Sequence, residues 1–278
     1  MICVKYLKLY NNSYKLRWYR GFGSSLDYNY FFIERGVTML EEAFDKYVSS
    51  YNINDSYIKL KYNHSYRVMK LQEKYAKKLG FSKEDIELAR VIGLLHDIGR
   101  FEQMKVFGND DDSKTIDHAD YSCVQLFDKG EIKRFVKREE WYPIIEFAIK
   151  NHNKRVLENN PDERAMMHAK LIRDTDKIDI IFLIGKLREV DVTPTKDKIH
   201  KRVLNEFYKH KVIAIKDIKN LNDHIVLQYS FVYDVNYPVC LKELKKNFGY
   251  YFEVQKNNKE IENVYNYAMN YIEERLEK

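Results

Sequence analysis

The sequence predicts an all-α protein with one main helical domain and additional helices after it. Of its 278 residues, 45% are apolar and 32% are charged, which is ordinary for a globular chain. Only 10 glycines and 4 prolines are present, too few for the many turns of a β-sandwich. From Met39 onward, apolar residues recur at the spacing of amphipathic helices.

Helix start and stop signals divide this part of the chain into elements. Ser82 is an N-cap candidate with Asp85 three residues later, and Pro143 fits the first turn of a helix. Gly80 and Gly99 fall where helix ends are expected. We therefore expect helices over 39–50, 57–79, 83–98, 116–128, 131–137, 141–157, 162–188, 197–209, 217–233, 237–248 and 258–276.

The pattern of the chain changes at Met39, and this change suggests its organisation. Residues 1–38 are rich in Tyr, Phe and Arg and have no sustained helical or strand period. We interpret them as an irregular N-terminal extension, and Met39 is a candidate start of the native protein. Residues 39–188 are expected to form the main domain, and residues 189–278 a helical C-terminal region that packs on it.

Composition also limits the setting in which the protein works. Cys3, Cys123 and Cys240 lie far apart without a CxxC motif, which is typical of reduced thiols in a cytoplasmic protein. No run of 18 apolar residues is present, so we expect no membrane association. The net charge of +6 is small and scattered, and it does not favour nucleic-acid binding.

Helical phase separates the histidines that face the protein interior from those that face solvent. His64 shares a stripe with Val68, and His152 shares one with Ile149. His96 follows an apolar run and also points inward, with Asp97 next to it, whereas phase leaves the direction of His118 open. A lone inward histidine is more often a satisfied core residue than a ligand. The histidines in polar C-terminal segments are expected at the surface: His200, His210 and His224.

The segment "KLIRDTDKIDIIFLIGKL" combines a central helix with several carboxylates. Apolar residues occupy both of its faces, so Asp174, Asp176 and Asp179 must all point at least partly into protein. A buried carboxylate is costly unless it is paired or binds a metal. One divalent cation would satisfy inward carboxylates and histidines together, and imidazole with carboxylate suits Mn, Fe, Co, Ni or Zn.

The order of these residues resembles the HD-domain superfamily of metal-dependent phosphohydrolases. Its hallmark is an isolated His, then an adjacent His-Asp, then a distant Asp that precedes Lys or Arg; the last rule selects Asp176. The resemblance covers roughly residues 55–185 and implies an HD-domain helical bundle holding one or two divalent ions. Two further histidines match members with a dinuclear centre. The implied ligands are His64, His96, Asp97, His118, His152 and Asp176.

The resemblance implies hydrolysis of a phosphate ester on a nucleotide or similar small metabolite. Asp97 would bridge two ions, and Asp97 and Lys177 would have catalytic roles. Arg100, Lys177 and Arg67 would bind the substrate phosphate, although a surface ion pair is an equally good interpretation of the first two. Two alternatives remain: a di-iron oxygenase with the same ligand order, and a nucleotide-sensing module without turnover.

Two further features bear on this interpretation. After His152 there is no second adjacent histidine and no Gly-Tyr-Pro segment, so the chain does not resemble the cyclic-di-GMP phosphodiesterase branch of the superfamily. The polar segment 107–115, "FGNDDDSKT", is expected to be a solvated turn, with a lid or metal-access loop as the alternative.

Overall fold

The computed structural model describes residues 38–189 and 191–277, and every regular element in these residues is a helix. The prediction of an all-α fold is therefore confirmed. The proposed N-terminal extension, including Cys3, falls almost entirely on residues outside the described ones, and its origin stays a prediction.

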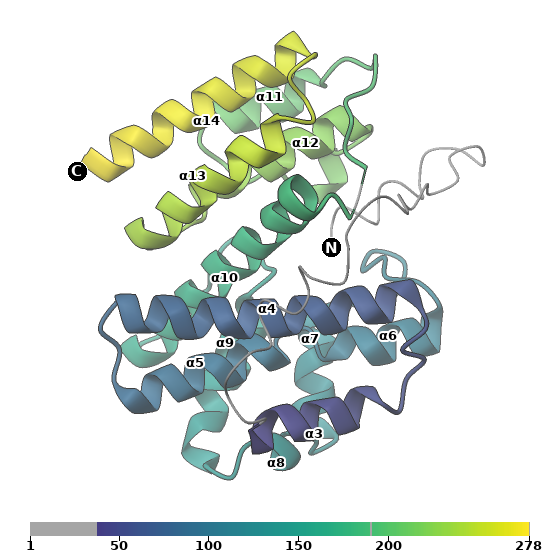
Figure 1. The fold of residues 1–278 in the computed structure, drawn as a ribbon, viewed down its shortest axis with the longest axis vertical. Coiled ribbons are helices and arrows are strands. Elements are labelled where there is room, and N and C mark those ends of the chain that lie inside the picture. Colours follow the sequence, from purple (N-terminus) through teal and green to yellow (C-terminus); the bar gives the residue numbers. More distant parts are fainter. Residues whose placement is uncertain (1–37, 190, 278) are drawn as a thin grey trace.

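The helices form two groups that are joined by one long helix (Figure 1). The first group contains α3 (Met39–Val48), α4 (Ser56–Lys78), α5 (Lys83–Leu95), α6 (Gly99–Phe107), α7 (His118–Cys123), α8 (Ile132–Phe135) and α9 (Tyr142–Asn151). The joining helix is α10 (Glu163–Phe182). The second group contains α11 (Lys201–Tyr208), α12 (Leu221–Tyr229), α13 (Pro238–Phe252) and α14 (Lys259–Glu277). Short 3-10 or π turns occur at Val124–Asp128, Glu139–Trp141, Leu183–Leu187, Ile215–Asp217 and Ser230–Tyr233.

The buried apolar residues form two hydrophobic cores, and α10 contributes to both. The second core also includes residues of α4 and α5, such as Tyr75 and Ala89. Ala169 and Ile172 belong to the core of the first group, which also contains Phe44 and Ile92. The end of α10, including Ile181, packs into the core of the second group. This explains why the α10 sequence is apolar on both faces. The predicted domain boundary at residues 188/189 stays a prediction.

Two predicted helices end earlier than expected, and each ends at a histidine. The segment 83–98 stops being helical at Leu95, and a separate helix, α6, begins at Gly99 where no helix was expected. His96 is the C-cap of α5, and its Nδ1 lies 2.8 Å from the Gly93 carbonyl oxygen. His152 caps α9 in the same way. Each ring satisfies a carbonyl that the helix end would otherwise leave open.

Glycines allow the helices that carry these histidines to pack closely. A Cβ atom at Gly93 in α5 would lie 2.7 Å from Gln72 Cγ and 2.9 Å from Met69 Cα in α4. A Cβ atom at Gly99 would lie 2.5 Å from the Ser122 backbone nitrogen in α7. Both contacts are too short for any side chain. Gly93 therefore allows α5 to lie close to the middle of α4, and Gly99 allows the start of α6 to lie close to α7.

The prediction for one C-terminal histidine is wrong. His224 was expected at the surface but is 0% exposed, because α12 lies inside the second core. The polar residues next to His224, which suggested a surface segment, are buried and form hydrogen bonds in the interior. Asp223 accepts hydrogen bonds from the backbone nitrogens of His200 and Lys219, which fixes the segments before α11 and α12. His200 and His210 are exposed, as expected.

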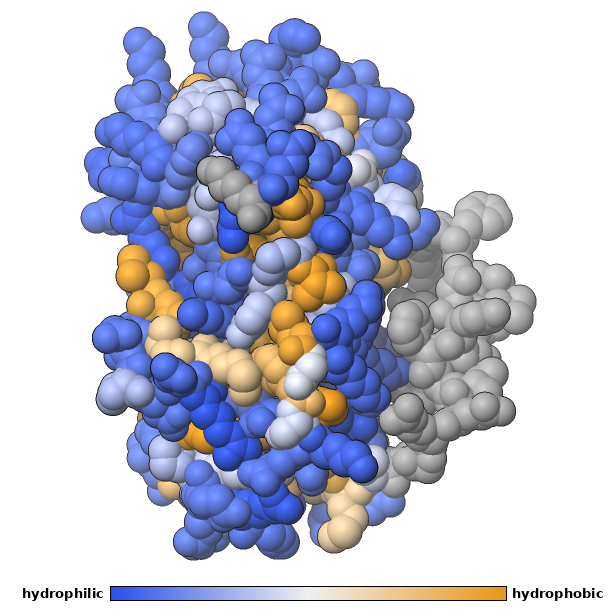
Figure 2. Space-filling view, turned by 90° about the vertical axis from the view of Figure 1, so that its left-hand side faces the viewer, coloured by the Kyte–Doolittle hydropathy of each residue, from blue (hydrophilic) through white to orange (hydrophobic). Residues whose placement is uncertain are grey.

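The described helices include none with both the length and the apolar character needed to cross a lipid bilayer. The face of the molecule in Figure 2 is mostly hydrophilic, with smaller apolar areas between the polar ones.

Candidate metal centre

The structure brings together all of the side chains that the sequence suggested as metal ligands. They come from five separate places in the chain. His64 is in the middle of α4, His96 and Asp97 are in the turn after α5, and His118 begins α7. The set is completed by His152 at the end of α9 and Asp176 in α10. The histidines and Asp97 are at most 8% exposed, and the Asp176 side chain is 14% exposed.

One half of the centre lies between α4, α5 and α10. His64 Nε2 is 3.2 Å from His96 Nε2 and 3.1 Å from Asp176 Oδ1. Asp97 Oδ2 lies 3.5 Å from His64 Nε2 and 3.6 Å from His96 Nε2. Atoms that bind one ion at about 2.1 Å are separated from each other by roughly 3.0–3.4 Å. We call these four side chains the first subsite.

The other half lies between α7 and α9, and we call it the second subsite. His118 Nε2 is 3.0 Å from His152 Nε2. Asp97 Oδ1 is 3.5 Å from the first of these nitrogens and 3.6 Å from the second. This oxygen is buried and has no hydrogen-bond partner in the described part of the chain. A buried carboxylate oxygen without a donor is costly, and a cation between it and the two imidazoles would satisfy it. The donor set therefore fits a divalent metal.

Partners behind the rings fix the direction of all four imidazoles. His64 Nδ1 lies 2.6 Å from Asp179 Oδ2, and His118 Nδ1 lies 2.6 Å from Asp112 Oδ2. The other two rings use backbone carbonyls; His152 Nδ1, for example, is 2.7 Å from one. An acceptor at Nδ1 keeps the proton there and leaves the Nε2 lone pair aimed into the centre. This is the tautomer that metal binding requires.

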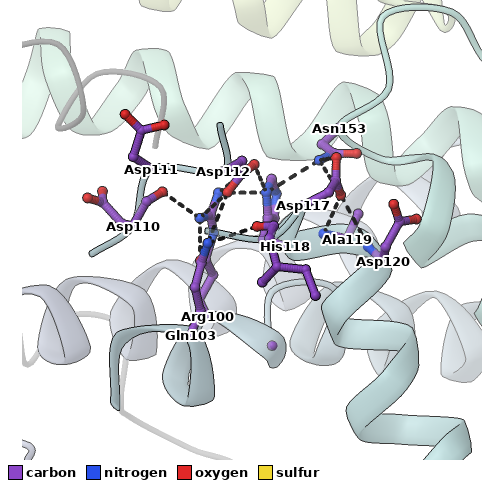
Figure 3. Close-up of polar contacts among 12 residues, drawn as sticks. Arg100, Gln103, Asp110, Asp111, Asp112, Asp117, His118, Ala119, Asp120 and Asn153 are labelled. Carbon is purple, nitrogen blue, oxygen red and sulfur yellow. Dashed lines mark hydrogen bonds and ion pairs between the residues drawn. The ribbon is translucent and has the colours of Figure 1, made fainter. Parts of the chain in front are cut away.

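The segment 107–115 is part of this support and is not a solvated turn. Asp110 and Asp111 are 4% and 3% exposed. Arg100 Nη1 donates to Asp112 Oδ1 at 2.6 Å and to the Asp110 carbonyl oxygen at 2.9 Å (Figure 3). Arg100 Nη2 also lies 2.6 Å from His118 Nδ1. Because a ring nitrogen cannot donate to Asp112 and accept from Arg100 at once, we assign the Nδ1 proton to the contact with the Asp112 carboxylate.

Burial and neighbouring charges set the protonation of these partners. Burial, together with the nearby Arg100, lowers the pKa of His118 to about 4, so the ring is neutral near pH 7. Burial alone would raise the pKa of Asp179, but Arg67 and His64 outweigh it and lower that pKa to about 2. Burial also opposes ionisation of Asp112, whereas His118 and Arg100 hold its pKa far below the usual range. Both supporting carboxylates are therefore ionised.

Helical phase alone placed three carboxylates of α10 inward, and the structure gives each a different partner. Asp176 is the one that reaches the histidines. Asp179 lies behind His64, as described above. Asp174 is 0% exposed and accepts hydrogen bonds from the backbone nitrogens of Asn236 and Tyr237, which tie α10 to the segment before α13.

The three basic residues expected at a substrate phosphate are all engaged by carboxylates. Arg100 is only 3% exposed and bonds to Asp112, so it is not at the surface. Lys177 Nζ lies 2.7 Å from Asp234 Oδ2, an oxygen that Arg173 Nη2 also contacts at 2.7 Å. The remaining residue, Arg67, donates to Asp179 at 2.7 Å and is the most exposed, at 22% of its side chain. Their role in substrate binding stays a prediction.

Sequence reasoning missed a lysine inside the centre. Lys61 is 2% exposed, and its Nζ lies 2.5 Å from Asp97 Oδ2. Burial lowers the pKa of Lys61, and Asp97 partly opposes that shift. Burial disfavours the charged form of Asp97, but Lys61 and His96 outweigh it and hold its pKa well below the usual range. The signal in the sequence that could have indicated this lysine is its position, because Lys61 lies one helical turn before His64.

Comparison with known proteins agrees with this arrangement. The family model described as HD domain matches residues 62–181, a span that contains all six proposed ligands. Neither a search of the curated proteins nor a search of the solved structures gave a match. The order of the ligands, their convergence in an all-α bundle and the family match lead to one conclusion. Residues 62–181 are an HD domain, and the His/Asp cluster within them is compatible with an HD-type metal site.

Proposed function

We propose that the protein is a metal-dependent hydrolase of a phosphate ester, carried on a nucleotide or a similar small metabolite. The observation that supports this most is the position of Asp97. Its two carboxylate oxygens face two different histidine pairs at 3.5–3.6 Å, so one side chain can serve two ions. Mn, Fe, Co, Ni and Zn all suit a set of imidazoles and carboxylates.

In this proposal each subsite holds one ion. His64, His96, Asp176 and Asp97 Oδ2 would hold the first, and His118, His152 and Asp97 Oδ1 the second. Bound divalent metals lower the pKa of water towards about 7 and offset negative charge on phosphoryl oxygens. The chain itself fixes the orientation of the imidazole rings, since each of the four has a partner at Nδ1 that prevents the ring from turning.

Basic residues around the centre supply positive charge for an anionic substrate. Arg67 borders the first subsite through Asp179, and Arg100 borders the second subsite through Asp112. Lys177 follows the ligand Asp176 directly and is held by Asp234. A substrate phosphate would have to compete with these carboxylates, and Arg67, as the most exposed of the three, is the best placed to do so.

The setting that we propose is the cytoplasm, with a small dissolved substrate and neither nucleic acid nor membrane as partner. The supporting observation is that Cys123 and Cys240 are both free thiols.

A substrate screen tests the proposal. Metal-free protein is loaded separately with Mn, Co, Ni or Fe, and phosphate release is measured over a panel of phosphorylated metabolites, with and without O₂. We expect release with Mn or Co that does not depend on O₂, is absent in His96→Ala and is unchanged in His200→Ala, which alters an exposed histidine. Turnover that needs iron and consumes O₂ would indicate an oxygenase instead. Nucleotide binding without release under every metal would indicate a sensor.

A further inference from the structure

The centre contains a positive charge that none of the proposed metal ligands requires. Lys61 lies on the face of α4 that carries His64, and its side chain is 2% exposed. Burying an ammonium group is costly, and replacing a buried ion pair with apolar groups is often neutral or stabilising. A lysine at this position therefore calls for an explanation beyond packing.

The carboxylate oxygen that Lys61 contacts belongs to the first subsite. Lys61 Nζ is 2.5 Å from Asp97 Oδ2, and this oxygen faces the Nε2 atoms of His64 and His96. The other oxygen, Oδ1, has no hydrogen-bond partner in the described part of the chain. The two subsites are thus unequal: a cation of the chain itself compensates the shared carboxylate on the first side only.

We infer that Lys61 is an internal counter-cation that weakens metal binding at the first subsite and stabilises the protein when that subsite holds no metal. The inference rests on the metal centre proposed above. An ammonium group and a divalent ion at one carboxylate oxygen repel each other. Metal binding must therefore either tolerate that repulsion or displace Lys61 from Asp97, and both reduce the affinity for the ion.

The same geometry has an opposite effect on the metal-free protein. Asp97, Asp176 and Asp179 converge on His64 within one buried region. Without a metal, Lys61 supplies positive charge next to the first of them. Removing its charge should thus destabilise the metal-free state and favour the metal-bound state. If Lys61 had a purely structural role, removing its charge would destabilise the metal-free protein but would not strengthen metal binding.

The test uses the full chain with Mn²⁺ alone as the probe. Affinity is measured by calorimetric titration of metal-free protein, and the melting temperature is measured with and without Mn²⁺. The variant is Lys61→Met, which has a similar length and no charge. Lys59→Met, at an exposed position of the same helix, is the matched control, and His96→Ala reports whether binding occurs at the proposed centre.

We expect Lys61→Met to bind Mn²⁺ at least tenfold more tightly than the wild type, which corresponds to about 1.4 kcal/mol. Its metal-free form should melt at a lower temperature, and Mn²⁺ should raise its melting temperature by more than it raises that of the wild type. Lys61→Arg, which keeps the charge, should bind no more tightly than the wild type. Lys59→Met should match the wild type in both measurements.

The outcomes separate this inference from the proposed function. Equal or weaker binding by Lys61→Met, with binding that His96→Ala abolishes, would overturn the role of Lys61 and leave the metal centre intact. Mn²⁺ binding that is insensitive to His96→Ala would overturn the centre and the inference together. If Lys61→Met does not fold, Lys61→Gln replaces it in the test, since it removes the charge but keeps a hydrogen-bond donor near Asp97. This variant too must bind Mn²⁺ more tightly than the wild type.

Discussion

His64 and Asp179 are 115 residues apart in the sequence, yet His64 Nδ1 lies 2.6 Å from Asp179 Oδ2. Arg67 donates to both oxygens of the same carboxylate, through Nε at 2.7 Å from Oδ1 and through Nη2 at 3.0 Å from Oδ2. Asp179 therefore fixes both the tautomer and the direction of a ring that belongs to the first subsite. A group of this kind controls metal affinity without touching the metal.

Asp179→Asn should reduce the affinity for Mn²⁺ by about 10- to 100-fold, because the amide is a weaker acceptor for the Nδ1 proton. Calorimetric titration of the metal-free variant measures this change. Asp128→Asn, at an exposed position, is the control and should bind like the wild type. Unchanged affinity in Asp179→Asn would show that Asp179 serves only to bind Arg67.

The second subsite should be removable on its own. His118→Ala and His152→Ala each delete a ligand that faces Asp97 Oδ1, whereas the first subsite keeps all of its side chains. Elemental analysis should then find about one metal per chain in each variant and about two in the wild type. One metal in all three proteins would remove the dinuclear proposal and leave a one-metal hydrolase.

Asp234 forms ion pairs with Lys177 and Arg173 of α10, and their contribution to stability should depend on pH. Burial alone would raise the pKa of Asp234, but Lys177 and Arg173 outweigh it and hold that pKa below its usual value. A carboxyl with a lowered pKa stabilises the folded protein above its unfolded pKa, and this contribution is lost as the pH falls through the folded pKa. Asp234 should therefore stabilise the protein fully near neutral pH and progressively less below about pH 4.

Asp234→Asn should accordingly reduce the free energy of unfolding by about 3–5 kcal/mol near pH 7, since it leaves two buried cations without their partner. The difference from the wild type should shrink as the pH is lowered below about 4. Urea denaturation over a pH series measures both effects. A difference that is constant at all pH values would show that the charge of Asp234 is not what stabilises the contact.

Two glycine substitutions should change stability in opposite directions. Gly99→Ala would place a methyl group 2.5 Å from the Ser122 backbone nitrogen and should destabilise the protein by about 1–3 kcal/mol or more. Gly249→Ala in α13 meets no heavy atom within 4 Å and should stabilise it by about 0.5–1 kcal/mol. Thermal unfolding compares the two. Equal stability of Gly99→Ala and the wild type would contradict the close contact of α6 with α7.

The sequence was informative where a periodic signal or an ordered motif existed. Apolar periodicity predicted most of the helices, and the adjacent pair His96-Asp97 together with the spaced His64 pointed to the centre. Helix ends were harder, because whether His152 continues α9 or caps it depends on where its side chain finds a partner. Single-residue patterns carry no information about such tertiary contacts.

The supporting residues of the centre could not be found in the same way. Asp112 lies in a polar segment that has the composition of a solvated turn, and only its contacts with Arg100 and His118 reveal its role. Lysine usually lies at the surface of a helix, and Lys61 is buried because of how α4 packs against the end of α5. In both cases the decisive information is the environment in the folded chain.

The most direct test of the central claim is a crystal structure of the Mn²⁺-loaded protein with anomalous scattering data, which locate the metal without assumptions about the ligands. We expect two peaks, one on each side of Asp97: the first between His64, His96 and Asp176, and the second between His118 and His152. A loaded crystal with no peak at Asp97, or with Mn²⁺ bound only elsewhere, would contradict it.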